Sequence, residues 1–147
     1  MLYFAYGSNL NHAQMEYRCA GATFIKKHIL KGHKLCFSHK TNRTVYGHAN
    51  IVKNKKSEVQ GAIWNISKKD EQELDVYEGI DYNYYQKEYF NFSGKKVLVY
   101  VQKKYYLQKP NSTYLHTIIQ GYKDCSLDIK KLKMIISNYK INYIVSW

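Results

Sequence analysis

The chain begins with M-L-Y-F-A-Y-G-S-N-L, residues 1–10, where an apolar run passes without a break into three small polar residues. The run Leu2 to Tyr6 predicts a short buried strand. Gly7-Ser8-Asn9 predicts a loop with exposed backbone N–H groups, and the polar stretch 11–18 predicts a short helix after it. Consecutive N–H groups at a strand end can bind an anion, although such a turn is more often only a turn.

Hydrophobic periodicity places the other elements. Further strands are predicted at 23–30, 34–38, 48–52, 59–66, 84–92 and 96–101, with glycines between several of them. Helices are predicted at 68–77, at 113–120 with an end at Gly121, and at 127–139. Ser67 and Asp70 form a near capping box for the first of these helices, and Gly79 suits its C-terminal end.

Many short strands joined by tight turns, with a few inserted helices, predict an α+β fold: a small closed mixed β-barrel with flanking helices. The regular strand–helix alternation of an α/β protein is absent. No linker, repeat or low-complexity segment divides the 147 residues, so we expect one domain over residues 1–147.

The formal net charge of +12 raises the question of nucleic-acid binding. Only two of the 23 cationic residues are arginines, Arg18 and Arg43, whereas the bidentate arginine fork is the usual reader of bases and phosphates. The lysines are scattered in pairs along the whole chain. This pattern is typical of a solvated surface, and no nucleic-acid partner is expected.

Cysteine and histidine patterns give no metal or disulfide signal. The three cysteines lack C-x-x-C spacing, and the six histidines lack H-x-x-x-H spacing. No signal peptide and no apolar stretch of about 18 residues is present, so we expect a cytoplasmic protein with no membrane partner.

Glu78 lies in L-D-V-Y-E-G-I, residues 74–80, at the predicted end of a helix and among apolar neighbours. A carboxylate in such surroundings has a raised pKa and can serve as a general base or acid. The position is unusual because its charge faces the negative end of the helix dipole. Most carboxylates at helix ends are nevertheless solvated.

Taken together, Y-F-A-Y-G-S-N-L at 3–10 and L-D-V-Y-E-G-I at 74–80 resemble two signatures of the γ-glutamylcyclotransferase family, in the same order. Further similar blocks are L-K-G-H-K-L-C-F at 30–37, V-Q-G-A-I-W-N-I at 59–66, V-L-V-Y-V around Tyr100 and P-N-S-T-Y-L-H-T-I-I-Q-G at 110–121. The resemblance covers roughly residues 2–136.

The resemblance implies an enzyme that converts a γ-glutamyl amino acid or amine into 5-oxoproline and the free amine without a cofactor. Glu78 would be the proton shuttle. The implied substrate-binding residues are Tyr6, Gly7, Ser8, Asn9, Leu10, Tyr100 and Tyr114. Glutathione-specific relatives carry Leu after the Gly-Ser pair, so Asn9 favours γ-glutamyl amino acids or amines as substrates.

Two features depart from the family pattern. His48 stands where relatives often have Gly, and this change would narrow or reshape the pocket. The tail at 140–147 has no counterpart; it would pack on the barrel or form a dimer contact, so a homodimer is one expectation. Two alternatives stay open: a γ-glutamyl- or anion-binding protein of the same fold without turnover, and a lysine-rich nucleic-acid binder.

Overall fold

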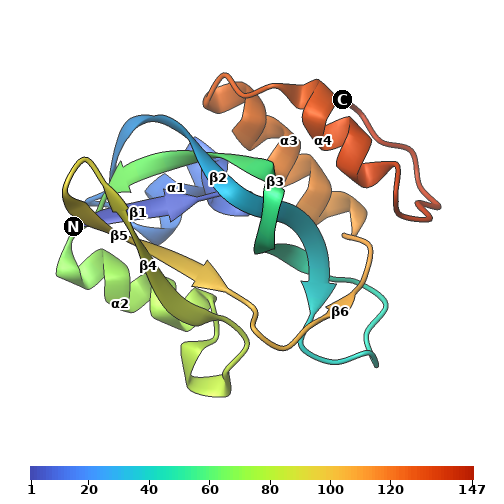
Figure 1. Cartoon of the computed structure of the whole chain (residues 1–147), viewed down its shortest axis with the longest axis horizontal. Coiled ribbons are helices and arrows are strands. Elements are labelled where there is room, and N and C mark those ends of the chain that lie inside the picture. The colour runs from blue at the N-terminus through green and yellow to red at the C-terminus, as the bar shows by residue number, and fades with distance from the viewer.

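In the computed structural model, which describes residues 1–147, six strands form one mixed sheet in the order β4-β5-β1-β3-β2-β6 (Figure 1). β1 is central, antiparallel to β3 and parallel to β5. The strands are β1 (Leu2–Ala5), β2 (Thr23–His39), β3 (His48–Asn65), β4 (Gln86–Phe92), β5 (Lys95–Val101) and β6 (Tyr106–Leu107).

Four α-helices and two short 3-10 helices flank the sheet. The helices are η1 (Ser8–Leu10), α1 (His12–Arg18), α2 (Lys68–Tyr77), η2 (Ile80–Tyr82), α3 (Ser112–Asp124) and α4 (Ile129–Ile136). In Figure 1, α2 lies near β4 and β5, whereas α3 and α4 lie together on the opposite side of the molecule.

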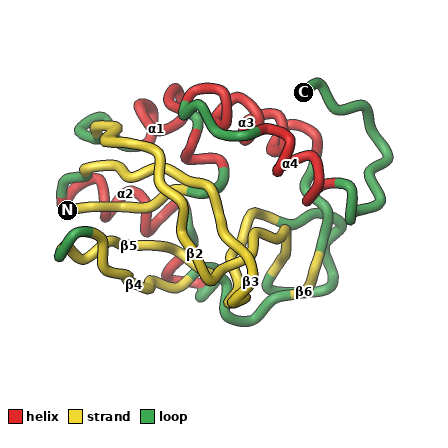
Figure 2. Tube along the Cα trace, turned by 45° about the horizontal axis from the view of Figure 1, so that its top comes forward, coloured by secondary structure: helices red, strands yellow, loops and turns green.

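The predicted α+β fold with flanking helices is confirmed, and the sheet curls strongly into a half-barrel (Figure 2). The barrel does not close, because the edge strands β4 and β6 each pair with one neighbour only. β6 has two residues, both exposed, and carries no periodicity that the sequence could reveal.

β2 and β3 are each one long strand, where periodicity predicts two short ones. Gly32, expected to separate strands, sits instead at an irregularity in the ladder between Lys31 and His33, with a φ of 78°. A glycine in this conformation is typical of a β-bulge, which bends a strand without ending it. In β3, the polar residues 54–57 have no partner in the β2–β3 ladder, and the Lys56 N–H donates to Asn54 Oδ1 at 3.0 Å.

Capping residues explain where α2 and α4 begin, whereas α3 continues past its predicted end. α2 spans residues 68–77 as predicted, and the Ser67–Asp70 capping box is present in full. α3 does not end at Gly121 but continues to Asp124. A Cβ at Gly121 would lie 2.6 Å from Leu10 Cβ and 2.7 Å from Asn11 N, so this glycine permits close packing against η1. α4 begins two residues later than predicted, after its N-cap Asp128, and ends three residues earlier, at Ile136.

The tail packs on its own chain. Alternate residues of 140–147 contact the core: Ile141, Tyr143, Val145 and Trp147 are partly buried against it. The Tyr143 hydroxyl donates to Pro110 O at 2.5 Å, and the Ser146 N–H donates to His116 Nε2 at 2.9 Å. The tail therefore holds the segment that leads into α3.

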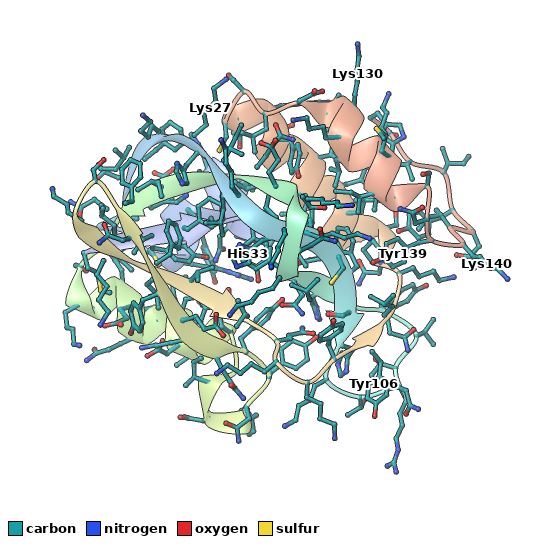
Figure 3. All side chains as sticks on the ribbon, in the orientation of Figure 1. Lys27, His33, Tyr106, Lys130, Tyr139 and Lys140 are labelled. Carbon is teal, nitrogen blue, oxygen red and sulfur yellow. The ribbon has the colours of Figure 1, made fainter.

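Lysine side chains such as Lys27, Lys130 and Lys140 project outward from the ribbon (Figure 3). None of the helices is long and apolar enough to cross a lipid bilayer.

Candidate active site

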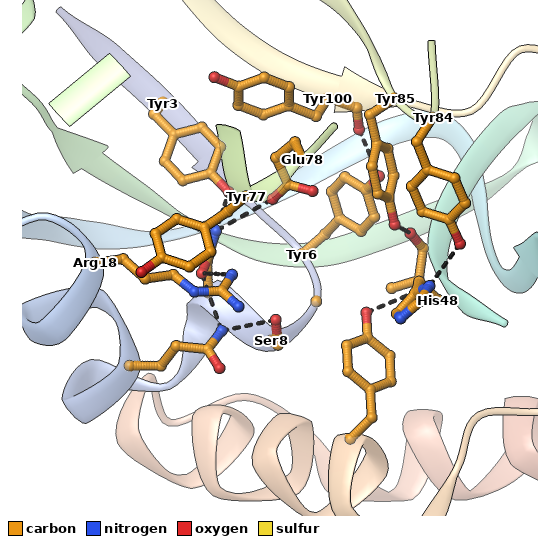
Figure 4. A pocket seen from close by; sticks show the side chains of 15 residues that line it. Tyr3, Tyr6, Ser8, Arg18, His48, Tyr77, Glu78, Tyr84, Tyr85 and Tyr100 are labelled. Atoms are coloured by element: carbon orange, nitrogen blue, oxygen red, sulfur yellow. Dashed lines mark hydrogen bonds between the residues drawn. The ribbon is translucent and has the colours of Figure 1, made fainter. Parts of the chain in front are cut away.

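A cavity of about 190 Å³ lies where the end of β1, the end of α2, β3 and α3 meet. Seven tyrosines line it, together with Gly7, Ser8, Asn9, Glu78 and a few other side chains (Figure 4). The opening loop of the chain and Glu78, 69 positions from Asn9 in sequence, thus face the same space.

The loop 7–10 approaches β3 and α3 closely. A Cβ at Gly7 would lie 2.8 Å from Ala49 Cβ and 3.4 Å from the Tyr114 hydroxyl, so only glycine fits without displacement. The N–H groups of Leu10 and Asn11 close the loop on the carbonyls of Gly7 and Ser8, both at 3.0 Å. Ser8 and Asn9 lie in the first turn of η1. Their N–H groups have no preceding helical turn whose carbonyl groups could accept a hydrogen bond.

Glu78 is held at the C-cap of α2 by the backbone around it. Its N–H donates to Leu74 O at 2.8 Å, and its carbonyl accepts from the Tyr85 N–H at 3.2 Å. Gly79 reverses the chain with a φ of 65°, and its carbonyl accepts from the Tyr84 N–H at 3.1 Å. The turn therefore fixes Glu78, Tyr84 and Tyr85 side by side.

Burial among aromatic rings raises the pKa of the Glu78 carboxyl from 4.5 to about 7, while the Arg18 charge works in the opposite direction. The Asn9 side chain donates from Nδ2 to Glu78 Oε1 at 3.4 Å and to the Tyr3 hydroxyl at 3.0 Å. A carboxyl that titrates near neutrality can accept and return a proton at physiological pH.

Beside the loop, a polar network orients Asn9. Its Oδ1 accepts from Gln14 Nε2 at 3.0 Å and from Arg18 Nη1 at 3.2 Å. The same Gln14 amide donates to Ser8 Oγ at 2.7 Å. The Arg18 guanidinium lies 4.3 Å from the centroid of the Tyr77 ring. The network fixes the direction of the Asn9 amide and brings one permanent positive charge to the cavity.

Of the residues implied by the resemblance, Tyr6, Tyr100 and Tyr114 line the cavity together with the loop and Glu78. The Tyr114 hydroxyl accepts from the Ala49 N–H at 2.9 Å, which leaves its own proton free to donate. The Tyr6 hydroxyl donates to Tyr100 O at 2.5 Å, and the Tyr100 hydroxyl donates to Asp75 Oδ1 at 2.7 Å. Leu10 does not line the cavity; it is fully buried against α3.

The site also contains residues that sequence reasoning did not select for it: Tyr3, Gln14, Arg18, Ala49, Tyr77, Tyr84 and Tyr85. His48, noted only as a departure, lines the cavity as well. The tyrosines could not be singled out because the chain has 16 of them. Arg18 could have been selected as a site candidate, because it is one of only two arginines in the chain.

No group of three or more His, Cys, Asp or Glu side chains is arranged to hold a metal ion. The polar groups that converge on the cavity are instead one titratable carboxyl, one guanidinium, tyrosine hydroxyls and a loop with spare N–H groups. A small cavity with this lining can bind a small polar substrate and exchange a proton with it.

Comparison with known proteins gives the family. Residues 3–121 match the family described as gamma-glutamyl cyclotransferase, AIG2-like. The chain is 32% identical over 149 aligned residues to the human protein named gamma-glutamylcyclotransferase, covering 93% of this chain and 79% of that one. The bovine protein of the same name is also 32% identical, with the same coverage.

A solved structure named gamma-glutamyl cyclotransferase superposes with a TM-score of 0.82 at 28% identity, covering 99% of this chain and 93% of that one. The chain therefore belongs to the gamma-glutamyl cyclotransferase, AIG2-like family. The family resemblance and the enzyme class predicted from the two sequence signatures are confirmed.

Proposed function

We propose that the protein cyclises the γ-glutamyl group of a γ-glutamyl amino acid or amine, releasing 5-oxoproline and the free amine. The observation that carries this proposal is the Glu78 carboxyl, with a pKa of about 7, facing the loop 7–9 across a small cavity. The names of the relatives support the same activity.

The reaction needs one proton shuttle and no cofactor. The substrate's own α-amine attacks the γ-carbonyl carbon, so that a C–N bond forms and the carbonyl oxygen takes the negative charge. Glu78 accepts one proton from the α-ammonium before the attack and delivers it to the leaving nitrogen as the bond between that nitrogen and the γ-carbonyl carbon breaks. The ring nitrogen loses its second proton to the released amine, which leaves as an ammonium ion. Because nucleophile and electrophile belong to one molecule, holding it folded supplies much of the rate enhancement.

The rest of the cavity has groups suited to binding and charge stabilisation. Arg18 is the permanent cation of the lining and would pair with the substrate's α-carboxylate. The backbone N–H groups of Ser8 and Asn9 and the free proton of the Tyr114 hydroxyl would donate to the developing oxyanion. Loss of one such donor typically costs about 3 kcal/mol of transition-state stabilisation.

The direct test is release of 5-oxoproline, measured by mass spectrometry, from a panel of γ-glutamyl dipeptides, γ-glutamyl amines and glutathione. We expect release from at least one γ-glutamyl amino acid or amine, in an amount equimolar with the free amine. Release from none of them would reject the cyclotransferase proposal. Tight binding without turnover would point instead to a binding protein of the same fold.

A further inference from the structure

His48 forms the wall of the cavity opposite the Arg18 network. Its ring meets the rings of Tyr84 and Tyr114 edge to face, with centroids 5.5 and 4.9 Å apart. Its Nδ1 lies 2.5 Å from the Tyr84 hydroxyl. These contacts on two sides hold the imidazole in one orientation.

The surroundings of Tyr84 indicate which ring nitrogen of His48 carries the proton. The buried Gln102 amide does not bond to Tyr84: its Oε1 accepts from Ser38 Oγ at 2.7 Å, and its Nε2 has no hydrogen-bond partner. The Tyr84 hydroxyl makes its hydrogen bond with His48 Nδ1 and with no other group of the protein. Because this nitrogen is the one acceptor that the neutral phenol meets in the protein, Tyr84 gives its own proton to His48 Nδ1.

His48 is therefore neutral, with its proton on Nε2. Burial, the nearby His39 and Arg18 lower the pKa of the imidazole, in agreement with a neutral ring at pH 7. Nε2 has no partner within the protein, and Figure 4 shows it on the cavity side of the ring. The cavity thus has a second oriented donor, at the end away from Arg18.

Glu78 lies between these two ends (Figure 4). In the cyclisation, the α-amine and the scissile nitrogen must both reach Glu78, whereas the α-carboxylate and the leaving group extend away from it. The permanent charge of Arg18 is the better partner for the α-carboxylate, which every γ-glutamyl substrate carries. The leaving group then points toward His48 and Tyr84.

Resting on the proposed function, we propose that His48 is the specificity-determining residue for the leaving group, its Nε2–H donating to the carboxylate of a leaving amino acid. Tyr84 is a positioning residue that fixes the tautomer and orientation of His48. The protein then prefers γ-glutamyl amino acids over γ-glutamyl amines, which lack this carboxylate.

The test compares two substrates that differ only in that group, γ-glutamyl-alanine and γ-glutamyl-ethylamine. The wild type is expected to favour the alanine compound in kcat/KM by roughly tenfold to a hundredfold, the usual effect of a hydrogen bond to a charged group. His48→Asn retains an amide only near the Nδ1 position and should lose this preference through a raised KM for the alanine compound.

Two further variants distinguish a hydrogen bond to the leaving-group carboxylate from an effect of the size of the His48 side chain. His48→Gln carries an N–H near the Nε2 position and should retain most of the preference, whereas Tyr84→Phe should lose part of it. The matched control is His33→Asn, at the β2 bulge far from the cavity, which should keep the wild-type ratio.

The results distinguish the two proposals. If the wild type releases 5-oxoproline without preferring the alanine compound, or if His48→Asn keeps the full preference, the role of His48 is refuted while the cyclotransferase proposal stands. Equal loss of preference in the Asn and Gln variants would likewise refute donation from Nε2. Release of 5-oxoproline from neither compound, nor from any other γ-glutamyl compound, would reject the proposed function itself.

Discussion

Glu78→Gln keeps the shape of the side chain and removes the group that accepts a proton. We expect kcat to fall by about a hundredfold or more, the usual contribution of a general base. Glu73→Gln, at an exposed position of the same helix, serves as the matched control and should retain wild-type activity. Undiminished 5-oxoproline release by Glu78→Gln would exclude Glu78 as the proton shuttle.

The same substitution should stabilise the fold at neutral pH. In the unfolded chain Glu78 ionises near 4.5, and in the folded protein its pKa is about 7, so the folded state holds the extra proton in between. Wild-type stability therefore falls as pH rises through this window, by up to about 3 kcal/mol. Urea unfolding should show Glu78→Gln more stable than wild type at pH 8 and equal to it at pH 4.

Between pH 4.5 and about 7, activity should rise while stability falls. The shuttle needs Glu78 ionised while the substrate carries its α-ammonium, so kcat/KM should rise with pH up to the Glu78 pKa of about 7. It should fall again as the substrate amine loses its proton, at a pH of about 8 or above. A pH–rate profile with its acid limb near 4.5 would contradict the raised pKa of Glu78.

Single residues were predictable where they belong to a recognisable local sequence. Gly7, Asn9 and Glu78 stand in such sequences, and all three line the cavity. Arg18 and Tyr84 do not, because their place in the cavity depends on how α1 and the turn after η2 pack in three dimensions. No local periodicity carries that information.

At the scale of elements, α3 and η1 pack closely because Gly121 has no side chain. Gly121→Ala would add a helix-favouring residue and yet place its Cβ 2.7 Å from the backbone of Leu10 and Asn11. We expect a loss of about 2 kcal/mol of stability, as for other overpacked cores. Activity should fall as well, since η1 carries Ser8 and Asn9.

Thermal unfolding and 5-oxoproline release together check this expectation, with the exposed neighbour Lys123→Ala as the control. A stabilised and fully active Gly121→Ala protein would show that α3 can move away from η1 freely. In that case helix propensity alone would decide the outcome.

The boundaries of elements were predictable to the extent that local chemistry decides them. α2 follows from Ser67, Asp70 and Gly79, all visible in the sequence. Gly121 has the same local appearance as a helix stop, but its role is a contact with residues more than a hundred positions earlier. The continuity of β2 through Gly32 likewise depends on its partner strand and not on its own periodicity.

At the scale of the whole molecule, the tail 140–147 attaches the last part of the chain to Pro110, just before α3, and to His116 within α3. Deleting it should expose part of the core beneath Ile141, Tyr143 and Val145 and lower the melting temperature by roughly 5 °C, as expected for a loss of about 2 kcal/mol. Size-exclusion chromatography of both forms should show the same oligomeric state. A change of state on deletion would assign the tail to a dimer contact instead.

The cavity is assembled from Tyr3 at one end of the chain to Tyr114 near the other, with Glu78 between them. No short segment contains it, so it exists only in the native state. Any molecule that fills it binds the folded chain alone and shifts the folding equilibrium by mass action. A γ-glutamyl compound that cannot cyclise is therefore a stabiliser of this protein, and its dissociation constant can be measured from the melting curve without any turnover.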